Sequence, residues 1–114
     1  MKLLLPILLL LLCVGCESGD SREYAIDADT AELQVAAWQE YDQLQDEGYS
    51  LLADAYCRTV PSDAPNGGFW YEGVNVLGVC IDTAAGYEIR VVGAIGWLLY
   101  HEIGHACGLS WGEW

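Results

Sequence analysis

The segment from Val92 to Gly108 constrains the fold most, because it is predicted to form one helix that must be well buried. Apolar residues recur at the three- and four-residue spacing of a helix, and the far side also carries Trp97 and Tyr100. Gly108 is placed to end the helix. A chain of 114 residues can cover such a helix only within one small domain. The positions that share the main face are Val92, Ile95, Leu98, Leu99, Glu102, Ile103 and Ala106.

This helix holds the only two histidines of the chain, His101 and His105, four residues apart. Residues at this spacing lie one above the other on a helix, so both imidazoles can offer a ring nitrogen to one metal ion. Glu102 is rotated by about 100° from His101, where it can reach a water bound to that metal without binding the metal itself. The His-Glu-x-x-His pattern therefore predicts a zinc site with Glu102 as the general base.

An amphipathic helix is also predicted in the first half of the chain. Asp29 or Thr30 can cap its start through a side-chain oxygen, and Glu32 places negative charge in the first turn. Gly48 lies just past its predicted end. The apolar residues at helical spacing are Leu33, Ala36, Ala37, Tyr41 and Leu44, and Trp38 is a candidate to extend this buried stripe.

The residues between the two helices favour strands. The end of 49–60 is strand-like, 61–68 is a loop rich in proline and glycine, and 69–82 is rich in β-branched and aromatic residues typical of one or two strands. Residues 87–91 fit either a short strand or the beginning of the last helix. The order of helix, strands and helix predicts an α+β fold with a small mixed sheet packed on two helices.

The N-terminus is typical of an export signal. A lysine is followed by an apolar run that is shorter than the roughly 20 residues a membrane-spanning helix needs. Small residues before Cys16 resemble the bacterial lipoprotein signal, in which the cysteine is lipidated and becomes the new N-terminus, although Cys13 stands where that signal usually has leucine. The alternative is a secretory signal cut near Gly15. Residues 1–15 are thus assigned to a signal, 16–28 to a flexible acidic tether and 29–114 to the folded domain.

The part after residue 15 is strongly acidic. It keeps all 17 acidic residues against only Arg22, Arg58 and Arg90, which gives a formal charge of −14. Such a surface repels phosphate backbones, which argues against nucleic acid as a partner. It favours solubility and, weakly, basic peptides.

Export would also permit a disulfide among Cys57, Cys80 and Cys107. Three pairings are open, and the sequence does not choose between them. A bond between Cys57 and Cys80 is expected because both lie in strand-like surroundings. Cys107 is expected to be a buried apolar residue of the last helix.

The last helix carries a run that resembles the zinc-binding signature H-E-x-x-H-x-x-G-x-x-H of the metzincin peptidases, namely His101-Glu102-Ile103-Gly104-His105-Ala106-Cys107-Gly108-Leu109. It is most similar to the matrixin-type versions, which have a small residue after the second histidine. The resemblance implies a metzincin N-terminal subdomain with His101 and His105 as zinc ligands and Glu102 as general base. It also implies that Gly108 turns the chain toward a third ligand, and that a strand near 76–82 lines the cleft and pairs with extended substrate.

The sequence departs from that signature after the glycine. The third ligand falls at position 111, which is Trp111, and an indole nitrogen is a donor that cannot bind zinc. Glu113 is the nearby carboxylate that could take its place, and the alternative is a solvated terminal side chain. The only methionine is Met1, so a C-terminal subdomain with its methionine turn is expected to be missing.

These features predict a zinc-dependent endopeptidase that cleaves protein or peptide substrates through a zinc-bound water activated by Glu102, with Zn²⁺ as cofactor. Its expected location is the bacterial cell envelope, with a lipid on Cys16 as membrane anchor, or the periplasm or exterior if no lipid is attached. Two alternatives stay open. One is an inactive or truncated metzincin-like lipoprotein with a binding role, and the other is a small acidic lipoprotein that carries the pattern by coincidence.

Overall fold

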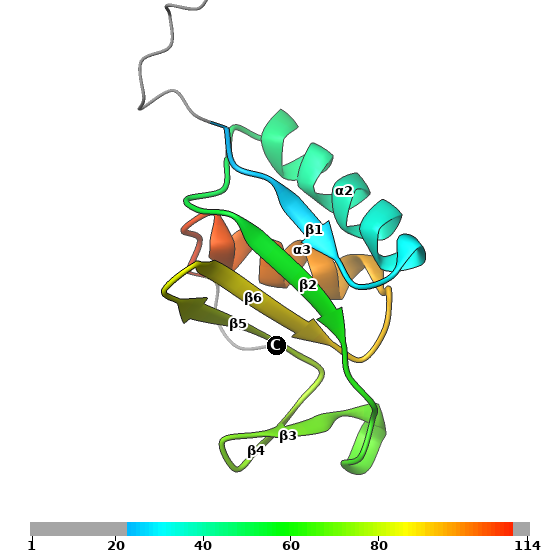
Figure 1. Cartoon of the computed structure of the whole chain (residues 1–114). Coiled ribbons are helices and arrows are strands. Elements are labelled where there is room, and N and C mark those ends of the chain that lie inside the picture. Colours follow the sequence, from blue (N-terminus) through cyan, green and yellow to red (C-terminus); the bar gives the residue numbers. More distant parts are fainter. Residues whose placement is uncertain (1–22, 111–114) are drawn as a thin grey trace, which may run out of the picture.

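The structure is a computed structural model that describes residues 23–110 (Figure 1). It contains two helices and a small mixed sheet, which confirms the predicted α+β class. The predicted signal at residues 1–15, the lipidation candidate Cys16 and the ligand candidate Glu113 lie outside the described residues. Between residues 23 and 110, no helix is long and apolar enough to cross a membrane.

The main sheet has four strands in the order β1 (Ile26–Ala28), β2 (Ala55–Thr59), β6 (Gly86–Val91) and β5 (Gly78–Thr83). The first three are parallel to one another, and β5 runs antiparallel to β6. β5 therefore forms one edge of the sheet, joined to β6 by a tight turn (Figure 1).

A separate hairpin of β3 (Phe69–Tyr71) and β4 (Val74–Val76) follows β2 in the chain and projects from one end of the main sheet (Figure 1). Its two turn residues, Glu72 and Gly73, have φ angles of 51° and 83°. Positive φ at both central residues is what a two-residue type I′ turn requires, so this turn fits the twist of the two strands.

Three segments differ from their prediction. Residues 26–28, which the sequence assigns to a flexible tether, form β1, because they pair with β2 and Ile26 is buried in the core. The segment 69–82 holds three strands, since the Glu72-Gly73 turn and Leu77 divide it. The loop at 61–68 includes one turn of 3₁₀ helix, η2 (Pro65–Gly67).

Helix α2 (Ala31–Asp46) forms as predicted. It begins after Thr30, whose Oγ1 accepts a hydrogen bond from Leu33 N at 3.1 Å. Glu47 caps its C-terminal end, and the following Gly48 has φ 99° and donates its N–H to Gln45 O at 3.0 Å. Its buried residues are Leu33, Ala37, Tyr41 and Leu44, whereas Trp38 stays partly exposed.

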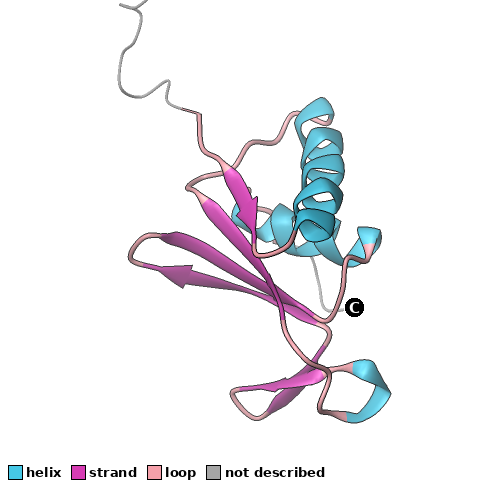
Figure 2. Cartoon of the chain, turned by 45° about the vertical axis from the view of Figure 1, so that its right-hand side comes forward, coloured by secondary structure: helices cyan, strands magenta, loops and turns pink. Residues whose placement is uncertain are grey.

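Helix α3 (Gly96–Ala106) packs beside α2 on the same face of the sheet (Figure 2). It begins later than the predicted Val92. The N–H of Val92 donates to Leu77 O at 3.1 Å, which continues the contact between the ends of β6 and β5. Residues 92–95 stay outside the helix, and Ile95 precedes its first turn in an extended conformation with φ −102° and ψ 120°.

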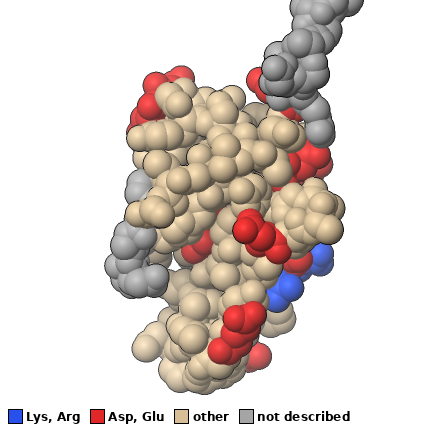
Figure 3. All heavy atoms as spheres, turned by 90° about the vertical axis from the view of Figure 1, so that its left-hand side faces the viewer, with Lys and Arg blue, Asp and Glu red and all other residues tan. Residues whose placement is uncertain are grey.

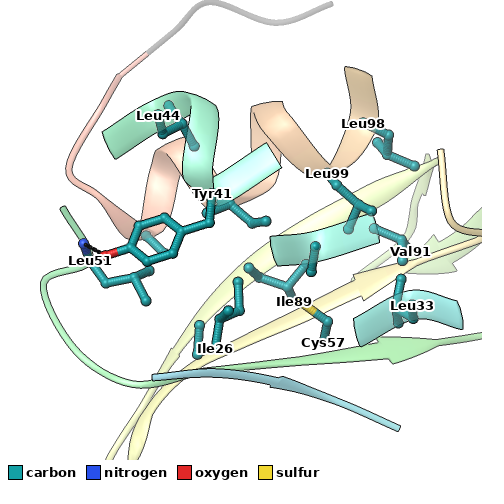
Figure 4. Packing of buried hydrophobic residues seen from close by; sticks show 14 residues of the cluster. Ile26, Leu33, Tyr41, Leu44, Leu51, Cys57, Ile89, Val91, Leu98 and Leu99 are labelled. Atoms are coloured by element: carbon teal, nitrogen blue, oxygen red, sulfur yellow. Dashed lines mark hydrogen bonds between the residues drawn. The ribbon is translucent and has the colours of Figure 1, made fainter. Parts of the chain in front are cut away.

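The core lies between the sheet and the two helices (Figure 4). Tyr41 brings a hydroxyl group into this core (Figure 4). Its Oη accepts a hydrogen bond from Leu51 N at 3.0 Å, so the buried polar atom has a partner. This packing holds α3 rigidly against the sheet, so the position of its side chains is fixed by the core. The largest fully buried side chains are Ile26, Leu33, Leu44, Ile89, Leu99 and Ile103.

The expected bond between Cys57 and Cys80 is not formed, and both are free thiols. Cys57 on β2 and Cys80 on β5 each face Ile89 of β6, which lies between them. Two strand spacings place their Cα atoms about 9.6 Å apart, whereas a disulfide needs about 4.4–6.8 Å.

Candidate metal centre

The two histidines of α3 converge on one point. Nε2 of His101 lies 3.2 Å from Nε2 of His105, and the rings meet edge to face with centroids 4.7 Å apart. Two Zn–N bonds of about 2.05 Å at a tetrahedral angle would place the nitrogens about 3.3 Å apart. The distance between the two nitrogens therefore matches one edge of a zinc tetrahedron, and it is also the distance of a hydrogen bond between the two rings.

The end of α3 orients His105. Gly108, with φ 93°, donates its N–H to His105 O, and Leu109 N donates to Gly104 O, so the helix ends in a Schellman motif. This turn brings Leu109 O to 2.9 Å from Nδ1 of His105. Because a carbonyl oxygen only accepts, Nδ1 carries the proton and Nε2 keeps its lone pair for a metal.

Glu102 lies against the backbone of the edge strand. Its exposed fraction is 5%, and that of His101 is 8%. A Cβ atom at Gly78 would lie 3.2 Å from Oε2 of Glu102 and 2.8 Å from Cδ1 of Leu98. Only glycine leaves room here, so β5 and α3 approach closely at the point where the carboxylate sits.

Both histidines and Glu102 line an open cavity of about 600 Å³. Its other walls are β5 and the β3–β4 hairpin. A smaller hollow of about 330 Å³ shares Gly78, His101 and Glu102 with this cavity and has both polar and apolar walls. The side chains of that hollow include Val76, Leu77, Trp97 and Leu98.

A third protein ligand is not found between residues 23 and 110, where no three His, Cys, Asp or Glu side chains are grouped to hold a metal. Cys80 lines the cavity, but burial raises the pKa of its thiol to about 12, with smaller contributions from the charges of Glu102 and Asp82. Among the described residues, however, Cys80 does not form a group of three metal-binding side chains with His101 and His105. Glu113 lies outside the described residues, as does Trp111.

The structure thus brings together His101, Glu102 and His105, the three residues that sequence reasoning selected. It gives specific positions to Gly78 and Asp82 within the strand near 76–82 that was expected to line the cleft, and it adds the carbonyl of Leu109, which that reasoning missed. The signal for Gly78 was present, since an isolated glycine in a strand often marks a close backbone approach. The other two depend on register and on the path of the chain after α3.

Three comparisons with known proteins found no match for this chain. No protein-family model matches the sequence. No match is found among curated proteins, and none among solved structures. The function is therefore argued from the geometry of the site.

Proposed function

We propose that the protein is a zinc-dependent endopeptidase of metzincin type. The observation that carries this proposal is the 3.2 Å distance between the two histidine Nε2 atoms, beside a buried glutamate and at the wall of a cavity. The spacing suits one zinc ion, and the cavity is large enough to admit a segment of peptide chain.

Zinc held by His101 and His105 would supply Lewis acidity, which lowers the pKa of water from ~15.7 toward about 7 and polarises a carbonyl. Glu102 opens on the same cavity, so its carboxylate is placed to take a proton from the attacking water. The same carboxylate then gives that proton to the leaving nitrogen. Gly78 supports this role, because its missing side chain leaves the space that the carboxylate occupies.

The edge strand β5 is suited to hold the substrate. Its residues Gly78 to Asp82 run along the cavity, and it is the last strand in the sheet. An extended peptide can add to such an edge through main-chain hydrogen bonds. The smaller hollow, whose apolar walls include Trp97 and Leu98, can then accept a substrate side chain near the cleaved bond.

We also propose, from the sequence, that the protein is a lipoprotein of a bacterial envelope anchored through Cys16, with a protein or peptide substrate in that compartment. Metabolic labelling with an alkyne fatty acid tests this. Label in the full chain, lost with Cys16→Ser, supports the anchor, and an unlabelled, soluble product supports a cleaved secretory signal.

The experiment that tests catalysis combines metal analysis with cleavage of a denatured protein. The purified protein should hold close to one zinc per chain and cleave the substrate, and a chelator should abolish cleavage. Glu102→Gln should keep zinc but lose cleavage, whereas His105→Ala should lose zinc. Asp42→Asn, on the exposed side of α2, is the matched control and should do neither.

The alternative is a metal-binding lipoprotein without catalysis. It is favoured by the ligand set between residues 23 and 110, which offers two histidines. Zinc bound by both the parent and Glu102→Gln, with no cleavage of any peptide in a diverse library, would select this alternative.

A further inference from the structure

The positively charged side chains of the described domain lie at Glu88, and none of them lines the cavity beside the histidines. Between residues 23 and 110 the basic residues are Arg58 and Arg90. Their Nε atoms lie 3.1 and 2.9 Å from the same oxygen, Oε2 of Glu88 on β6. On the face shown in Figure 3, acidic atoms occur in several separate places and basic atoms gather at one margin. The field along the β5 edge is therefore negative.

Two carboxylates besides Glu102 line the cavity, and they differ in their surroundings. Glu72, at the tip of the hairpin, follows Tyr71, whose ring has the guanidinium of Arg90 5.8 Å from its centre. The positive charge of Arg90 therefore lies close to the hairpin wall that carries Glu72. Asp82, near the end of β5, is exposed, and no lysine or arginine is among the described residues that line the cavity.

Asp82 lies where two hollows meet. It faces Tyr87 across the β5–β6 pair, and both residues also line a second hollow of about 570 Å³. Asp54 and Tyr24 belong to that hollow too, and no lysine or arginine is among its described lining residues. The place thus offers carboxylates together with tyrosine rings, the groups that hold a lysine or arginine side chain by charge and by cation–π contact.

The charge of Asp82 is felt by its neighbours. Burial raises the pKa of the Tyr87 hydroxyl, and the charge of Asp82 is the next cause. Asp82 also contributes to the raised pKa of Cys80, which faces the same cavity as His105. A cation bound at Asp82 would therefore lie in continuous space with the candidate metal centre.

We propose that the substrate is a cationic peptide, with a lysine or arginine side chain held by Asp82 and Tyr87. This rests on the proposed peptidase function. Gly78, beside Glu102, and Asp82 are four residues apart on β5, a distance of about 13 Å along an extended strand. A peptide paired with β5 would therefore be cut about four residues from its basic residue.

The test measures binding apart from cleavage. The zinc-loaded protein is titrated into a fluorescein-labelled glycine–serine peptide with one lysine, and into its glutamine and glutamate analogues. The lysine peptide should bind about two- to fivefold tighter than the glutamine peptide, because Asp82 is exposed and an ion pair with a solvent-exposed carboxylate is weak but still more favourable than a neutral contact. Asp82→Asn should remove that difference, and Asp82→Lys should reverse it in favour of the glutamate peptide.

Asp42→Asn changes the net charge equally but on α2, so it should keep the lysine preference. The proposal is overturned if Asp42→Asn weakens lysine binding as much as Asp82→Asn, or if the parent binds the lysine and glutamine peptides alike. Thermal unfolding of each variant checks that it is folded. Lysine-selective binding without cleavage would count against the peptidase function only, whereas cleavage without lysine preference would count against this inference only.

Discussion

The glycine that ends α3 is predicted to control zinc affinity as well as stability. Gly108 has φ 93°, where an L-residue costs about 1–2 kcal/mol. Alanine there would also place Cβ 3.2 Å from Cδ1 of Leu52. We therefore expect Gly108→Ala to lower the free energy of unfolding by about 1–2 kcal/mol. The turn it distorts is the one that aims Leu109 O at Nδ1 of His105, so the proposed metal ligand should also lose its orientation.

The chain supplies a matched control in Gly48. It ends α2 with the same hydrogen-bond pattern and φ 99°, and nothing lies within 4 Å of its Cβ position. We therefore expect Gly48→Ala to lower the free energy of unfolding by about 1 kcal/mol and to leave the position of the histidines unchanged. Loss of a carbonyl partner behind a metal-binding histidine typically weakens affinity about 10–100-fold, so Gly108→Ala should bind zinc at least about tenfold more weakly than Gly48→Ala.

Urea unfolding measures the two stability changes, and competition with a chromophoric chelator measures zinc affinity. Affinity should be compared at a temperature where both variants are fully folded, so that unfolding does not contribute. Equal zinc affinities for Gly108→Ala and Gly48→Ala would refute the argument that the Leu109 carbonyl sets the protonated nitrogen of His105. Equal stability of Gly108→Ala and the parent would refute the backbone argument.

Three further predictions test the fold around the site. Gly78→Ala should lower the melting temperature through a net cost of about 1–2 kcal/mol, while Gly93→Ala, whose Cβ would meet nothing closer than 3.9 Å, should not. Thr30→Ala should cost about 1 kcal/mol in urea unfolding, because α2 loses its cap. The hydrogen bond from Arg90, then that from Arg58, lowers the pKa of Glu88 below 4.5. The ion pairs of Glu88 therefore make a small, salt-sensitive contribution to the free energy of unfolding above that pH, and this contribution is lost as pH falls through the lowered pKa. Glu88→Gln should therefore reduce the loss of stability at acid pH in a stability–pH curve.

Helix α2 was predictable because its signals are local. Thr30 precedes the first turn, apolar residues repeat on one face, and Gly48 follows the last turn. Each acts within a few residues, and the structure uses each in the way its chemistry implies. The pair His101 and His105 was predictable for the same reason, since their separation depends only on helix geometry.

The sheet was harder to predict because its partners are distant in sequence. Ile26 sits in an acidic segment with little strand signal, yet pairing with Ala55 buries it. Residues 87–91 fitted two structures by pattern, and only their place between β2 and β5 makes them a strand. The same register separates Cys57 from Cys80, which local strand character could not reveal.

The two walls of the cavity differ in how firmly they are held, because β5 belongs to the main sheet whereas β3 and β4 pair only with each other among the described residues. α3 and β5 pack on the core, so His101, Glu102 and His105 are backed by close-packed side chains. The hairpin pairs within itself in the described part of the chain, and an isolated two-stranded hairpin is only marginally stable. The proposed metal-binding and catalytic residues thus belong to the wall that packs on the core, and Asp82 shares that wall because it lies on β5. A preference for cationic peptides carried by Asp82 would therefore be fixed relative to the histidines, whereas contacts from Glu72 would vary with the hairpin.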